Sequence, residues 1–220
     1  EISKRLGIEV GQQTMYLNIG NVYRQRGDHD NAMQHYEQAL AIAQHMLEQS
    51  RAEGSDERDA MLRIASVYHN MALVKMDLGE YDEALNLLED AEAIDTSLNN
   101  TSGLAKRYDA MGLILTKKGL YSEALSRFEE AKRIAKGDGN NRTLAYIHYH
   151  LGELFVNQEQ WQSAEREFRE CIRLGDLTEE YPLVVLAMQQ LADVLDLLDE
   201  PSHEIRREAE RLRRSIQYKK

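Results

Sequence analysis

The chain has 220 residues, of which 42% are apolar and 30% are charged, with only two prolines and one cysteine. This length and apolar content suffice to bury a sizeable core, which excludes a disordered chain. One cysteine excludes a disulfide framework and a thiolate metal cluster within the chain, and it fits a reducing, cytoplasmic compartment. The 38 acidic and 27 basic residues leave a net charge of −11, which argues against general nucleic-acid binding. No apolar run approaches the roughly 18 residues of a membrane span.

An internal repeat organises the sequence. Five stretches align so that a small residue returns at intervals of 52, 40, 40 and 40 residues. Further small or turn-forming positions keep the same spacing, so the register is not a chance match. The recurring small residues are Gly20, Ala72, Gly112, Gly152 and Ala192.

Apolar residues at helical spacing predict two helices in each repeat. Ser55 and Ser122 suit helix starts, and Pro182 and Pro201 suit first helical turns. The longer first interval is interpreted as an extended helix, a turn at Gly54 and a longer following helix. In chain order, the predicted helices are residues 13–26, 30–53, 56–78, 81–96, 103–118, 122–136, 142–157, 161–174, 182–198 and 201–217.

Helix pairs of this kind cannot bury their apolar faces alone. Small residues let the two backbones approach, aromatic residues fill the space beside them, and each pair must stack on its neighbour. The pattern therefore predicts an all-α fold of five antiparallel helix pairs. The fifth pair has Glu204 at an alanine position and an arginine-rich second helix, which is typical of a terminal cap.

The repeat resembles the tetratricopeptide repeat over almost the whole chain. The pattern of that family places a bulky residue, a Leu-Gly-like pair and a Tyr before spaced alanine, aromatic and alanine positions. In the first unit the matching residues are Tyr16, Ile19, Gly20, Tyr23, Ala32, Tyr36 and Ala39.

The resemblance implies a right-handed α-solenoid, a tetratricopeptide-repeat (TPR) superhelix, as a single domain over residues 1–220. Two departures are the interval of 40 residues rather than about 34 and the missing proline after the second helix. This long-repeat form is similar to Pins-type proteins, kinesin light chains and bacterial TPR regulators. The repeat units are expected at about residues 13–54, 55–100, 101–140, 141–180 and 181–217.

Candidate catalytic and metal-binding residues are few. His148 and His150 lie two residues apart on a predicted helix, so they point in different directions, and no HExxH motif occurs. We interpret His148 as a packing residue, and Cys171, at an alanine position of the repeat, as a buried structural thiol. The sequence therefore predicts no enzyme activity, no metal and no cofactor.

In this family the first helix of each pair lines a concave groove that can hold an extended peptide. Side-chain amides, isolated charges and exposed aromatic rings suit such recognition, although an ordinary helix surface is also mixed. The resemblance implies groove positions at Leu17, Asn21, Arg24, Gln25, His69, Asn70, Leu73, Lys106, Asp109, Leu113, Lys117, Tyr146, Tyr149, Glu153 and Asn157.

One submotif of the family, which holds the C-terminal carboxylates of chaperone tails, is only partly present. Asn21, Asn70 and Lys106 match it, but apolar residues replace two of its three cations. Losing these cations removes most of the charge that would hold two carboxylates. Arg107 is nearby in sequence and is expected to point to another side of its helix.

The sequence favours a non-catalytic protein-binding or peptide-binding scaffold or adaptor. The expected partner is a protein or peptide with an extended acidic or amphipathic segment, and neither nucleic acid nor a membrane. The alternative is a sensory or regulatory input module of a larger signalling or transcription-regulating protein. The start of the chain at Glu1, without a methionine, favours such a longer protein.

Overall fold

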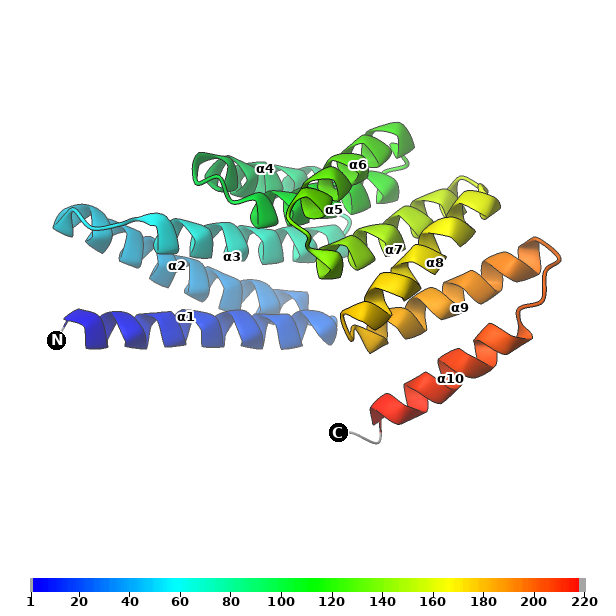
Figure 1. The fold of residues 1–220 in the computed structure, drawn as a ribbon. Helices are drawn as coiled ribbons and strands as arrows, with labels where there is room; N and C mark the ends of the chain where they lie inside the picture. Colours follow the sequence, from blue (N-terminus) through cyan, green and yellow to red (C-terminus); the bar gives the residue numbers. More distant parts are fainter. Residues whose placement is uncertain (1, 218–220) are drawn as a thin grey trace. The chain divides into compact units, whose positions relative to one another are not determined.

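The computed structural model describes residues 2–217, with side chains from residue 7 to residue 216. These described residues form ten α-helices and no β-strand, so the all-α prediction is confirmed (Figure 1). The helices are α1 (Ile2–Gln25), α2 (His29–Glu53), α3 (Arg58–Asp77), α4 (Tyr81–Ser97), α5 (Thr101–Lys117), α6 (Tyr121–Gly137), α7 (Asn141–Asn157), α8 (Trp161–Leu177), α9 (Tyr181–Leu197) and α10 (His203–Gln217).

The helices fall into two compact units, residues 1–110 and residues 111–220, and the boundary in the sequence lies inside α5. In the first unit α1 packs against α2, α2 against α3, and α3 against α4. In the second unit the same succession runs from α6 to α10. Each of these helices runs back along the one before it, so each unit is a stack of antiparallel helices (Figure 1).

Apart from the start of α1, every helix bound lies within three residues of its predicted position. The start of α1 was predicted too late, because the residues before Gln13 carry no repeat signature. The predicted helix start at Ser55 is also wrong: α3 begins at Arg58 with Glu57 at its N-cap. Pro201 precedes α10 and does not occupy its first turn.

The recurring small residues make room for an aromatic ring of the partner helix. A Cβ built on Gly20 would lie 2.5 Å from Tyr36 Cε1, and one built on Gly112 would lie 2.7 Å from Phe128 Cε1. The same arrangement recurs at Gly152, and all three rings are fully buried. Because real Cβ atoms do not come this close to other atoms, these positions exclude any side chain unless the ring moves.

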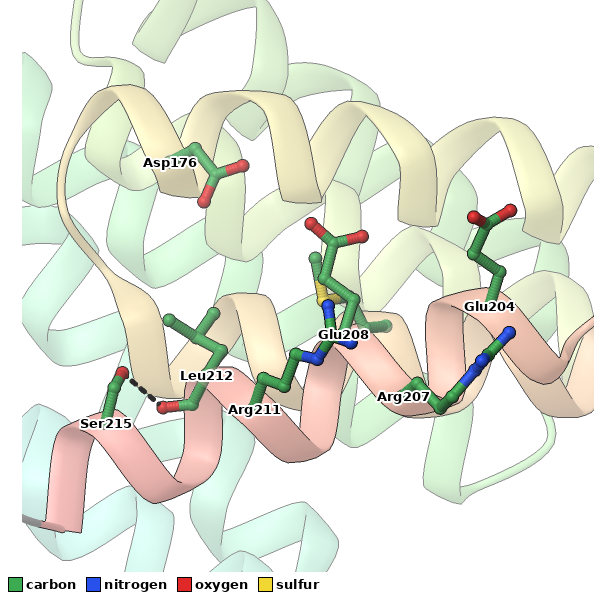
Figure 2. Close-up of a pocket in the computed structure, with 8 residues that line it drawn as sticks. Asp176, Glu204, Arg207, Glu208, Arg211, Leu212 and Ser215 are labelled. Carbon is green, nitrogen blue, oxygen red and sulfur yellow. Dashed lines mark hydrogen bonds between the residues drawn. The ribbon is translucent and has the colours of Figure 1, made fainter.

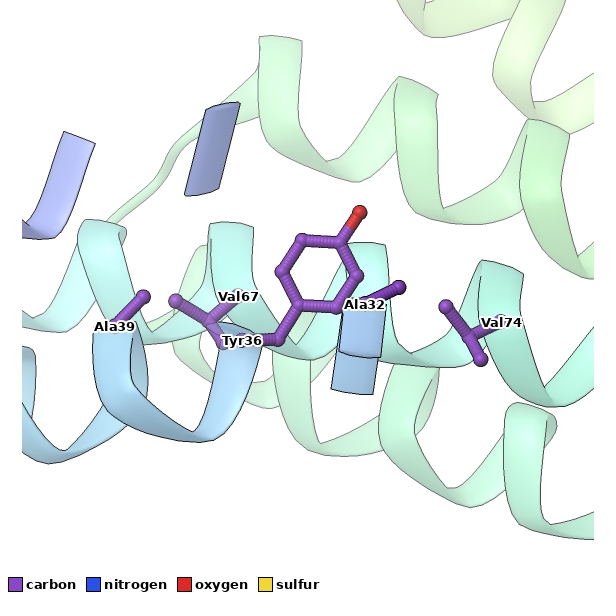
Figure 3. Close-up of a cluster of buried hydrophobic side chains, with 5 residues drawn as sticks. All are labelled: Ala32, Tyr36, Ala39, Val67 and Val74. Carbon is purple, nitrogen blue, oxygen red and sulfur yellow. The ribbon is translucent and has the colours of Figure 1, made fainter. Parts of the chain in front are cut away.

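Tyr36 forms the centre of a buried cluster in the first unit (Figure 3). Its ring lies among Ala32 and Ala39 of α2 and the valines Val67 and Val74 of α3. Burial raises the pKa of the Tyr36 hydroxyl to about 12. The hydroxyl therefore stays protonated at physiological pH and is available as a hydrogen-bond donor.

Cys171 of α8 is fully buried, which agrees with the interpretation as a structural thiol. Burial raises the pKa of its thiol from 9.0 to about 12. We expect this thiol to react with a disulfide reagent much more slowly in the folded chain than in urea, because the raised pKa lowers the fraction of reactive thiolate and burial blocks access to the sulfur. Since Cys171 is the only cysteine, the release of the reporter thiolate measures this rate directly. Equal rates in both states would contradict the burial of the thiol.

Candidate functional site

A cleft of about 450 Å³ opens between α3 and the start of α5 in the first unit. Most of its lining residues are polar, and they combine hydroxyl, amide, imidazole and cationic side chains. The residues of α3 are Leu62, Ser66, His69 and Asn70, and those of α5 and the turn before it are Asn100, Ser102, Gly103, Lys106 and Arg107.

Three of the predicted groove residues, His69, Asn70 and Lys106, line this one cleft. The Asn70 amide nitrogen donates to the backbone oxygen of Ser66 at 3.1 Å, which orients the side chain and leaves the amide oxygen available to accept. Lys106 is exposed, and no described residue forms an ion pair with it. The cleft therefore carries a free positive charge beside an oriented amide.

Arg107 also lines the cleft, so the expectation that it points to another side of α5 is wrong. Arg107 is 4% exposed, and its Nε lies 3.1 Å from Oδ2 of the fully buried Asp95 of α4. The other oxygen of Asp95, Oδ1, accepts from the side-chain amide of Asn100 at 2.7 Å. Gly103 permits this arrangement, since a Cβ there would overlap the Asp95 carboxylate.

Burial and the nearby cations of the cleft keep His69 neutral. Burial is the main cause, and the nearby cations Arg107 and Lys106 add to it, so that the pKa of His69 falls to about 3. The Nδ1 atom of its ring is buried and has no hydrogen-bond partner among the described residues. Burial also lowers the pKa of Arg107, and the carboxylate of Asp95 opposes that effect.

Two predicted groove residues of α1 already have partners inside the first unit. The Oδ1 atom of Asn21 accepts from the Tyr36 hydroxyl at 2.7 Å. The Nε atom of Arg24 lies 2.8 Å from Oδ2 of Asp77, which joins α1 to α3. Asn21 and Arg24 therefore help to hold neighbouring helices together, a role that the sequence pattern did not indicate.

The remaining predicted residues of the first unit vary in exposure. Leu17 packs against the cluster around Tyr36, and Leu73 and Asp109 are half-buried. Gln25 is exposed at the end of α1. The structure does not bring these four residues into the α3–α5 cleft.

In the second unit, the two predicted tyrosines of α7, Tyr146 and Tyr149, contact side chains from the following residues of the chain. The Tyr146 hydroxyl donates to Glu180 at 3.0 Å, and the Nε atom of Arg142 lies 2.6 Å from the same carboxylate. The ring of Tyr149 lies 5.9 Å from that of Phe168. Burial first, and then the neighbouring Glu153, raises the pKa of Tyr149.

Three further predicted groove residues lie in the second unit. The Asn157 amide donates to the backbone oxygen of Glu153 at 2.8 Å. Leu113 is half-buried, and Lys117 is exposed at the end of α5. None of these residues forms a polar cluster comparable to the one in the first unit among the residues that the structure describes.

A second cleft, of about 600 Å³, lies in the second unit between the end of α8 and α10 (Figure 2). Asp176 of α8 and Glu208 of α10 face the cleft from opposite sides (Figure 2). Met188 and Leu212 supply apolar surface. Burial raises the pKa of Asp176. None of the predicted groove residues lines this cleft. Its mixed acidic and basic lining favours no single class of ligand.

No group of three or more His, Cys, Asp and Glu side chains within residues 2–217 is arranged to hold a metal ion. His148, considered above as a possible ligand, has its Nδ1 atom 2.5 Å from the carboxylate of Glu167. None of the described helices is long and apolar enough to cross a membrane.

Stacked antiparallel helix pairs, three of which place an aromatic ring against a glycine, define an α-solenoid repeat protein. Residues 15–46 and residues 63–137 each match a family profile described as tetratricopeptide repeat. These two matches identify the chain as a tetratricopeptide-repeat protein. This fold serves in general as a non-catalytic protein-interaction scaffold or regulatory module. No curated protein sequence matches the chain.

Solved structures share the fold at low sequence identity. BtubC (BKLC) from P. vanneervenii is 16% identical with a TM-score of 0.68, over 90% of this chain and 78% of that one. A putative kinesin light chain from Podosopora anserina with nearly identical TPR-like repeats is 20% identical with a TM-score of 0.57, over 93% and 92%. The Rap conjugation gene regulator of the plasmid pLS20, in complex with the Phr* peptide, is 16% identical with a TM-score of 0.76, over 98% and 57%. At these identities the likeness concerns the fold alone.

Proposed function

We propose that the chain is a peptide-binding adaptor that holds an extended acidic or amphipathic segment of a partner protein. The observation that carries this proposal is the α3–α5 cleft, where His69, Asn70 and Lys106 line one polar cavity. An asparagine amide can pair with both the N–H and the C=O of an extended backbone, so it binds a strand without reading its side chains.

The electrostatics of the cleft support an acidic ligand. The protein as a whole has a net charge of −11, yet Lys106 is a cation without an ion-pair partner among the described residues. The one carboxylate buried behind the cleft, that of Asp95, is already paired with Arg107. An incoming carboxylate would therefore meet a net positive charge there, and a basic peptide would be repelled.

The first test is selection of peptides from a random display library on the immobilised chain. We expect selected peptides to be enriched in Asp and Glu and to lose affinity when the cleft changes. Asn70→Ala should weaken binding by about 1–3 kcal/mol, the cost of stranding a polar partner. Lys106→Glu should weaken it chiefly at low salt, because an exposed charge is screened as ionic strength rises. Binding is measured by fluorescence anisotropy over a series of salt concentrations.

The controls separate the cleft from the rest of the surface. Lys136→Glu makes the same charge change at an exposed lysine of α6 and should leave affinity nearly unchanged. Asn21 is not a suitable test position, because it accepts a hydrogen bond from Tyr36 and its loss would also weaken the helix pair. If substitutions at Arg127 and Glu130 of α6 abolish binding while Asn70→Ala does not, the second helices form the interface and the proposal is wrong.

A second candidate function is a sensory input module of a regulatory protein. It is favoured by the similarity of fold to the Rap regulator, which aligns with 98% of this chain at a TM-score of 0.76. The two functions differ in what peptide binding does. An adaptor only tethers its partner, whereas a sensor changes the activity of a domain joined to it. The test measures the activity of such a joined domain with and without bound peptide. A change in activity favours the sensor, and no change favours the adaptor.

A further inference from the structure

The two adjacent cations of α5 lie in different environments. Lys106 is exposed at the mouth of the cleft, whereas Arg107 is 4% exposed and lines the same cleft from within. An arginine so deeply buried is costly unless a carboxylate compensates its charge. Asp95, itself fully buried on the neighbouring helix α4, supplies that compensation at 3.1 Å.

We propose that Arg107 is a second recognition residue for one carboxylate side chain of the bound segment, and that Asp95 is the positioning residue that holds its guanidinium at the floor of the cleft. This proposal rests on the peptide-binding function proposed above and adds to it the residue that selects Glu or Asp over their amides.

The geometry leaves Arg107 with donors to spare. A guanidinium carries five N–H donors in a rigid fork, and Asp95 approaches it through a single oxygen at Nε. The second Asp95 oxygen is taken by the Asn100 amide, so the carboxylate cannot swing round to use the rest of the fork. Asp95 is also the only described residue that pairs with Arg107. The remaining donors suit a carboxylate that enters the cleft, which matches the fork geometrically.

Asp95 also limits the charge of the cleft. Because the buried pair is neutral as a unit, the cleft presents the single net positive charge of Lys106. One carboxylate then neutralises the cleft, and the neutral imidazole of His69 adds no further charge. A glutamine in place of that carboxylate would present an N–H₂ group to the N–H donors of Arg107 and would also leave Lys106 uncompensated, so it should bind less well.

The experiment uses two capped tripeptides, acetyl-Ala-Glu-Ala-amide and acetyl-Ala-Gln-Ala-amide, titrated separately into the ¹⁵N-labelled chain. We expect the Glu peptide to shift the Arg107 side-chain Nε resonance saturably and to bind at least about tenfold more tightly than the Gln peptide, as a charge-assisted bond does relative to a neutral one. Arg107→Lys keeps the charge but not the fork, and it should lower this Glu/Gln ratio several-fold. Arg63→Lys, at a half-buried arginine of α3 paired with Asp59, is the matched control and should not change the ratio.

A second variant guards against simple loss of folding. The double change Asp95→Leu with Arg107→Met replaces the buried ion pair by apolar groups of similar size, which proteins often tolerate. We expect this variant to fold, to bind through Lys106 alone, and to show a reduced Glu/Gln ratio. An unchanged ratio in both variants, or equal affinity of the wild-type chain for the two tripeptides, would overturn the assignment of Arg107.

The outcomes also separate this inference from the proposed function. If display selection yields acidic peptides whose affinity falls with Lys106→Glu but not with Arg107→Lys, peptide binding stands and the role of Arg107 fails. If selection yields no peptide at all, the proposed function itself fails.

Discussion

Replacing Gly112 by leucine is expected to destabilise the second unit by about 3 kcal/mol, the upper end of the usual cost of overpacking. A Cβ at this position would already lie 2.7 Å from Cε1 of Phe128, before the rest of the leucine is added. The ring cannot move aside because it is fully buried. The substitution must therefore push the backbones of α5 and α6 apart. The measurement is the urea midpoint followed by far-UV circular dichroism.

The control for this prediction is Gly137→Leu, which adds the same side chain at the end of α6. A Cβ there would meet no atom within 4 Å, so we expect a change of less than about 0.5 kcal/mol. If Gly112→Leu melts like the wild-type chain, the repeat register is wrong.

Removing the carboxylate of Asp95 is expected to cost about 3–5 kcal/mol, which is the range for breaking a buried ion pair. Asp95→Ala would leave Arg107 buried without a counter-charge and the Asn100 amide without its acceptor. The same truncation at Asp59, which is exposed and pairs with Arg63 four residues on, should cost only about 0.3–0.5 kcal/mol. The comparison is made by urea unfolding of both variants at two salt concentrations.

A small loss of stability in Asp95→Ala would contradict this prediction. If Arg107 simply turned outward to water, the loss would be small and would resemble that of Asp59→Ala. Such a result would mean that the Asp95–Arg107 pair does not organise the cleft.

The helices could be predicted from the sequence because their signals are local. The small residues at Gly20, Gly112 and Gly152 return at a fixed spacing, and each opposes an aromatic ring 16 residues later. Capping was harder to read. Ser55 looks like an N-cap by composition, but the helix begins at Arg58, whose backbone N–H donates to Asp56.

Only part of the candidate site could be predicted from the sequence, because the contacts that position Arg107 come from the second helix of a pair. The repeat register of the family places His69, Asn70 and Lys106 on one surface. It considers only the first helix of each pair and takes no account of side chains on the second helix. Asp95 lies on α4, and its carboxylate draws Arg107 into the cleft. Two signals were available in the sequence. Asp95 occupies a position that is otherwise small and buried in the first four repeats, and Gly103 is a glycine where a side chain would collide with the Asp95 carboxylate.

The contacts between glycine and aromatic ring also bear on how the protein folds. In each pair the ring lies 16 residues after its glycine, so the central contact of a helix pair closes a short loop. Closing a short loop costs little chain entropy, and folds dominated by such local contacts reach the native state quickly. Folding can therefore nucleate in more than one helix pair and spread to its neighbours, with no obligatory first step at either end of the chain.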